Sequence, residues 1–123
     1  MNFSPLLKFL ARCPAIQQPI GHGVFDSGIW WIKFGIDIEH KLAWNVVQEL
    51  GCVLNYISLE ERLPVVFYPV SPAPYLNGGP RQFLSWVVES QDVKFTPAKA
   101  AKWLEGRLPN PVEDESEWPT DED

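Results

Sequence analysis

Three polar residues within four positions form the cluster most able to do chemistry in this chain. Asp37, Glu39 and His40 lie where a strand-like pattern gives way to a helical one. Ligand sites of α/β proteins often lie at such junctions, and a histidine oriented by a carboxylate can act as a general base. A helix start produces the same spacing, because an aspartate caps the first turn and a glutamate complements the helix dipole. We expect the helix start and keep a ligand site as the alternative.

The second histidine, His22, lies between Gly21 and Gly23. Flanking glycines would let a ligand approach the imidazole, although they also occur in flexible loops that bind nothing. We therefore add His22 to the alternative ligand site. The spacing of the histidines and of Cys13 and Cys52 fits no zinc motif, so we expect no metal and no cofactor.

Motifs of the common enzyme classes are missing from the sequence. It contains no Gly-x-Ser-x-Gly, no Gly-x-Gly-x-x-Gly and no Walker A pattern. Neither cysteine has a catalytic setting. Without an export signal both should be reduced, and Cys52, among apolar neighbours, should be a core residue. The chain is therefore more consistent with a protein that has no catalytic activity.

One face of the clearest predicted strand carries candidate binding residues. In the segment 29–37, apolar residues alternate with Trp31, Lys33 and Asp37, so these three share the face opposite the apolar one. If that face is uncovered, Trp31 is an aromatic of the kind enriched at interface hot spots; the alternative is that the N-terminal segment covers it. This face is the first candidate for protein binding.

Two other segments add candidates. Tyr75 lies in a proline-rich loop, which is stiff enough to bind a protein with little loss of entropy. Arg81 follows it and could hold an anion at a helix start. Trp118 is unusual within an acidic tail and suggests that the tail docks, either on its own body or on a partner. The candidate binding residues are thus Trp31, Lys33, Asp37, Tyr75, Arg81 and Trp118.

Hydrophobic periodicity and capping residues predict seven elements. The segment 15–28 is expected to be a loop, and Gly51 is expected to close the second helix. A competing interpretation continues that helix through residue 57. The predicted elements are a helix at 4–12, a strand at 29–37, a helix at 38–50, strands at 52–59 and 64–70, and helices at 80–90 and 97–105.

This order predicts an α/β-type (α+β) fold with the sequence α-β-α-β-β-α-α. A small three-stranded mixed sheet with helices mainly on one face would bury the apolar patterns. Residues 1–110 form a single globular domain in this interpretation. Residues 111–123 are rich in acidic residues and proline, and are expected to form a disordered tail.

The charge distribution limits the partners. The net charge of −6 comes from the tail, because residues 1–110 hold ten basic and nine acidic side chains, whereas residues 111–123 hold seven acidic and no basic ones. The body offers no basic patch for nucleic acid, and no apolar stretch approaches the roughly 20 residues needed to span a membrane. We expect a cytoplasmic protein.

These observations favour a small protein-binding or inhibitory protein. Immunity proteins against secreted toxins share the profile of a small, acidic single domain, which is an analogy of size and charge alone. The alternative is a small enzyme or ligand binder that uses Asp37, Glu39, His40 and His22.

Overall fold

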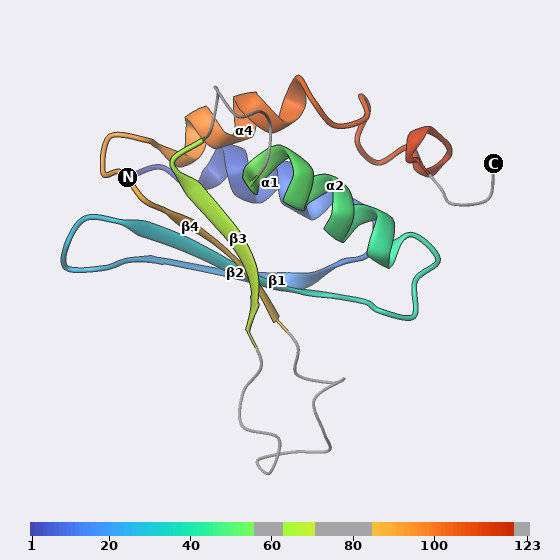
Figure 1. The fold of residues 1–123 in the computed structure, drawn as a ribbon, viewed down its shortest axis with the longest axis horizontal. Coiled ribbons are helices and arrows are strands. Elements are labelled where there is room, and N and C mark those ends of the chain that lie inside the picture. The colour runs from blue at the N-terminus through green and yellow to red at the C-terminus, as the bar shows by residue number, and fades with distance from the viewer. Residues whose placement is uncertain (56–62, 71–84, 120–123) are drawn as a thin grey trace, which may run out of the picture.

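In the part of the chain that the structure describes, a four-stranded antiparallel sheet with the order β1-β2-β4-β3 carries helices α1, α2 and α4 on one of its faces (Figure 1). The structure is a computed structural model, and it describes residues 1–55, 63–70 and 85–119. The α+β class and the placement of the described helices agree with the sequence analysis, but the sheet has one strand more than predicted, and all of its described strand pairs are antiparallel. The elements are α1 (Ser4–Arg12), β1 (Ile16–Val24), β2 (Trp30–Ile36), α2 (Ala43–Asn55), β3 (Val65–Val70), β4 (Ser85–Ser90), α4 (Pro97–Glu105) and the 3-10 turn η2 (Glu115–Glu117).

The elements with strong local signals match their predictions. Helix α1 has a proline in its first turn, and α4 is capped by Thr96, whose hydroxyl accepts a hydrogen bond from the Lys99 backbone N–H. Strand β2 buries every second side chain, including Trp30 and Phe34, against the helices. The indole N–H of Trp30 donates to the Phe95 carbonyl at 2.6 Å, which ties β2 to the segment before α4.

Strand β1 was expected to be a loop, and this prediction was wrong. Its sequence contains Pro19, Gly21 and Gly23, which are unfavourable in most strands. It is an edge strand that pairs only with β2, and its register shifts between Gln17 and Gly21. An edge strand buries few side chains, so the alternation that reveals other strands is missing here.

Helix α2 differs from the prediction at both ends. It begins at Ala43 instead of residue 38 and continues through Gly51 to Asn55, so the competing interpretation of a longer helix was correct up to that point. The strand predicted at 52–59 is wrong over Cys52 to Asn55, and residues 56–62 lie outside the described part. Gly51 does not cap the helix but faces the sheet, where an added Cβ would lie 4.0 Å from the Phe67 ring.

Strand β4 occupies part of the segment predicted as a helix at 80–90, so that prediction is wrong over Ser85–Ser90; residues 80–84 lie outside the described part. Consecutive apolar residues Trp86, Val87 and Val88 fit a helical pattern equally well. They form a strand because β4 lies between β2 and β3. Trp86 and Val88 lie on the face that carries the helices, and Val87, on the opposite face, is 7% exposed among the side chains of the neighbouring strands. The buried hydroxyl of Ser90 accepts a hydrogen bond from the Trp30 backbone N–H.

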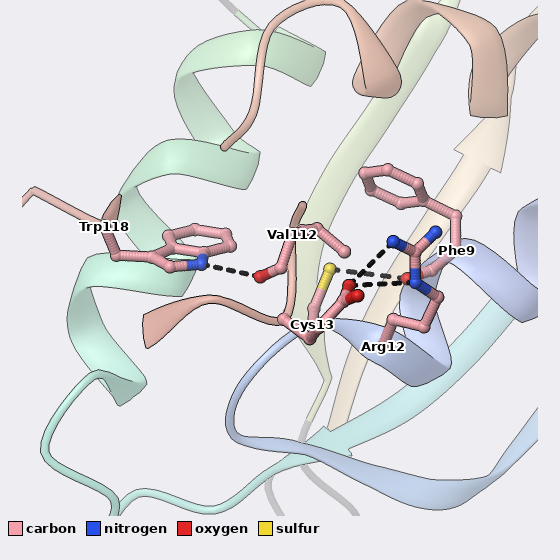
Figure 2. Close-up of polar contacts among 6 residues, drawn as sticks. Phe9, Arg12, Cys13, Val112 and Trp118 are labelled. Atoms are coloured by element: carbon pink, nitrogen blue, oxygen red, sulfur yellow. Dashed lines mark hydrogen bonds and ion pairs between the residues drawn. The ribbon is translucent and has the colours of Figure 1, made fainter. Parts of the chain in front are cut away.

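The C-terminal segment packs on the body, which differs from the disorder expected beyond residue 110. Val112 and Trp118 are 2% and 3% exposed and belong to the hydrophobic core. Figure 2 shows the Trp118 indole N–H donating to the Val112 carbonyl, at 2.9 Å. The Arg12 guanidinium donates to Glu113 at 2.7 Å. A hydrogen bond from its own backbone N–H, together with Arg12, lowers the pKa of Glu113 from its usual value. Of the two alternatives for Trp118, the structure shows docking on its own body.

The two cysteines are both free, and Cys52 is not the core residue that the sequence analysis expected. Cys52 is exposed on α2, whereas Cys13 is buried at the end of α1 and its thiol donates weakly to the Phe9 carbonyl at 3.6 Å (Figure 2). Burial raises the pKa of the Cys13 thiol from 9.0 to about 12. Cys13 is therefore a protonated core residue near neutral pH.

Candidate functional site

The face of the sheet that points away from the helices is the candidate site, and we call it the open face. Figure 1 shows α1, α2 and α4 together on the opposite side, and no described helix lies on the open face. Strand register places three rows of side chains across it, because residues paired directly across antiparallel strands share a face. The rows are Gly23, Trp31, Glu89 and Val66; Gly21, Lys33, Val87 and Tyr68; and Gln17, Gly35, Ser85 and Val70.

Trp31 lies across the neighbouring strand, over Gly23. A Cβ added to Gly23 would be 2.6 Å from the indole ring, and one added to Gly21 would be 3.8 Å from it. The two glycines therefore leave room for the indole to lie against the β1 backbone. The two glycines flank His22 in sequence, but in the sheet they make room for the Trp31 indole. The result is a half-buried aromatic platform fixed in position on the open face.

Two charged groups stand on the central strands of the open face. Lys33 on β2 is exposed and makes no hydrogen bond or ion pair in the described part of the chain. Glu89 on β4 accepts a hydrogen bond from the Tyr68 hydroxyl at 2.7 Å, and this bond raises the pKa of Tyr68. The face thus combines an aromatic platform, an unpaired cation and a tyrosine–carboxylate pair, which is a composition found at protein interfaces.

Both edges of the sheet resist the addition of another strand. On β3, the Asn55 side-chain amide donates to the Phe67 carbonyl and accepts from the Phe67 N–H, each at 2.9 Å. These backbone groups therefore point away from β4, at the free edge, and are already satisfied. On β1, Pro19 has no N–H and lies within the irregular register.

The two glycines under Trp31 provide a matched pair of variants. Gly23→Ala should lower the free energy of unfolding by about 1–2 kcal/mol and move Trp31, because the new Cβ overlaps the indole. Gly21→Ala should change it by about 0.5 kcal/mol or less, because its Cβ meets only ordinary contacts. Urea unfolding and the Trp31 indole resonance in NMR spectra would measure both effects. Equal behaviour of the two variants would contradict the packing of Trp31 on Gly23.

The Asp37, Glu39 and His40 cluster forms a turn before α2. The Asp37 carboxylate accepts the Glu39 backbone N–H at 3.1 Å, and His40 Nδ1 accepts the Leu42 backbone N–H at 2.9 Å. His40 Nε2 lies 3.6 Å from the Glu115 carboxylate of the C-terminal segment. The observed helix begins at Ala43, after His40, whereas the sequence analysis placed its start at residue 38 with Asp37 as the cap. Both ring nitrogens of His40 face groups of this chain.

His22 lies on β1, opposite Ile32, so it occupies the face that carries the helices. Its exposed ring is 4.6 Å from that of Phe3. The described contacts do not bring His22 together with His40. The described residues also contain no group of three or more His, Cys, Asp or Glu side chains arranged to hold a metal ion.

Of the other candidate binding residues, the structure describes Asp37 and Trp118. Asp37 follows the end of β2 and is engaged in its turn. Trp118 is buried, so it acts as an anchor within the molecule instead of a contact for a partner. Tyr75 and Arg81 lie outside the described residues.

Sequence reasoning missed Tyr68, Val87 and Glu89 as members of the open face. The alternation within the correctly predicted strand at 64–70 could have placed Tyr68 opposite Phe67. The other two residues belong to β4 and were hidden by the helical interpretation of that segment.

Comparisons with protein-family models, with curated proteins and with solved structures found no match to this chain. Within the described residues, no helix combines the length and the apolar character needed to cross a membrane.

Proposed function

We propose that this chain is a small cytoplasmic protein that binds or inhibits one protein partner, in the manner of an immunity protein, and that it binds through its open face. The observation that carries the proposal is the position of Trp31. Its indole lies over Gly23 on a sheet face without a described helix, and it is only half-buried there. An indole held in one orientation loses little entropy when a partner covers it, so it suits a binding hot spot.

The surroundings of Trp31 support a protein partner. Lys33, two residues along the strand, offers an unpaired ammonium group. Glu89 lies directly across from Trp31 on β4, and its partner Tyr68 follows on β3, on the same face. Aromatic residues beside a few charges are typical of interfaces between proteins. A carboxylate on the face and a single exposed lysine give no support for a nucleic-acid surface, which needs several basic residues.

The alternative of an enzyme or ligand site at the Asp37, Glu39 and His40 cluster has less support. Asp37 and His40 accept backbone hydrogen bonds that form the turn before α2, and Glu115 faces the other His40 nitrogen. These contacts account for the positions of both side chains without a ligand. We therefore propose a protein without catalytic activity.

Affinity capture with two tryptophan variants tests the proposed function. Trp31→Ser should abolish the capture of a specific, stoichiometric protein from the native cells, because loss of a hot-spot tryptophan costs about 2 kcal/mol or more. Trp44→Ser is the matched control, since Trp44 is 58% exposed on α2, which packs on the other side of the sheet. Mass spectrometry would identify and quantify the captured protein. Equal capture by the wild type and the Trp31→Ser variant, or no specific capture at all, would reject the proposal.

A further inference from the structure

Under two-fold symmetry the open face brings its Trp31 platform against apolar side chains and its Lys33 toward Glu89, and we infer that it pairs with the same face of a second copy in a two-fold symmetric dimer. This inference rests on the proposed function in treating the open face as a protein-binding surface. When no other partner is present, a second copy of this chain occupies the open face.

The strand order defines how two copies would meet. β2 and β4 are the two central strands of the sheet. A two-fold axis that runs along the strands, between β2 and β4, places β2 of each copy across from β4 of the other. The same operation places β1 across from β3. Aligned sheets pack in this way at a separation of about 10 Å.

The symmetry places the β1 edge, over which the Trp31 indole lies, across from the side chains of the β3 edge. Within one row, Gly21 lies at the β1 edge and Tyr68 at the β3 edge, so each Gly21 faces Tyr68 of the other copy. In the next row, Gly23 likewise faces Val66 of the other copy. The Trp31 indole lies over these two glycines, so it would meet Val66 and Tyr68 of the other copy in an apolar contact.

The charges are complementary in the same arrangement. Lys33 lies on β2, and Glu89 lies on β4, one row away along the strands. The symmetry brings each Lys33 toward Glu89 of the other copy, so two equivalent ion pairs form around the axis. Within one chain the two side chains are diagonal neighbours, yet no ion pair joins them in the structure. Lys33 is thus available for a carboxylate of the second copy.

The area of the open face predicts how tightly the two copies associate. Four strands spaced about 4.8 Å apart, and about six residues long at roughly 3.4 Å each, cover about 400 Å² in projection. Stable complexes bury about 800 Å² of accessible surface on each partner. We therefore expect a dimer that dissociates on dilution.

Complementary charge reversals of the full chain test the inference. Light scattering after size exclusion, over a wide concentration range, should show the wild-type mass rising from 14.0 kDa toward twice that value. Lys33→Glu makes both charged positions of the face acidic, and Glu89→Lys makes both basic. Each variant alone should dimerise about tenfold more weakly or worse, because like charges meet across the axis. An equimolar mixture of the two should recover the dimer, since both ion pairs reform between unlike chains.

Recovery on mixing separates contacts between chains from effects within one chain. Lys8→Glu on the exposed surface of α1 changes the net charge equally and should leave the dimer intact. Circular dichroism would verify that each variant is folded. A wild type that stays at 14.0 kDa at all concentrations overturns the inference, as does a mixture that stays monomeric. A monomeric wild type whose captured partner still depends on Trp31 overturns only the dimer. A dimer that captures no other protein overturns only the proposed function.

Discussion

Replacing Trp118 with alanine is expected to lower the free energy of unfolding by about 3–5 kcal/mol. The indole is 3% exposed within the core, and its N–H donates to the Val112 carbonyl at 2.9 Å. The substitution removes the packing of a large aromatic side chain and leaves a cavity between the C-terminal segment and the body. Urea unfolding monitored by circular dichroism would measure the loss.

The matched control for this prediction is Trp44→Ala. Trp44 is 58% exposed on α2, so its removal should change the free energy of unfolding by only about 0.5 kcal/mol. If Trp118→Ala and Trp44→Ala unfold at the same urea concentration, the C-terminal segment does not pack as described.

Because Trp118 is part of the core, a truncation that removes it affects folding as well as binding. A chain that ends at Asn110 loses both Val112 and Trp118 from the core. It also loses Glu113, which pairs with Arg12. A loss of partner binding in such a truncation would therefore report on folding as well as on the tail. Point variants on the open face are the better test of binding.

Replacing Asn55 with alanine is expected to lower the free energy of unfolding by about 2–3 kcal/mol. The Asn55 amide satisfies the N–H and the carbonyl of Phe67 on edge strand β3 at 2.9 Å each. Alanine cannot replace either hydrogen bond, so two partly buried backbone groups lose their partner. The freed edge should also pair with other chains, because unsatisfied strand edges are templates for aggregation.

Asn45→Ala is the control for the Asn55 prediction. The Asn45 amide makes a single exposed hydrogen bond, to the Pro119 carbonyl at 2.7 Å. Its loss should cost about 1 kcal/mol or less. Urea unfolding would give the difference in stability, and static light scattering would follow aggregation with increasing concentration. An Asn55→Ala variant that is as stable and as soluble as Asn45→Ala would show that the β3 edge does not need this cap.

The candidate site was predictable only where it lies on a strand with clear alternation. Trp31 and Lys33 fall on the polar-facing side of β2, and the pattern of buried residues in that strand was enough to place them together. The partners that complete the face could not be found in this way. Tyr68 and Glu89 come from strands whose neighbours in the sheet are distant in sequence. Which strands lie side by side depends on the packing of the whole sheet.

The sequence by itself determined α1, β2 and α4, because their signals act over a few residues. Prolines in the first turn, the Thr96 cap and strict alternation in β2 are local properties of the chain. Tertiary structure decided that β1 and β4 are strands and that Trp118 is buried. β1 is a strand because Gly21 and Gly23 accommodate Trp31 from the next strand. β4 is a strand because neighbours on both sides bury it, and Trp118 is ordered because the helices offer it a place in the core. In each case the stabilising contact comes from a residue far away in the sequence, which no local pattern can reveal.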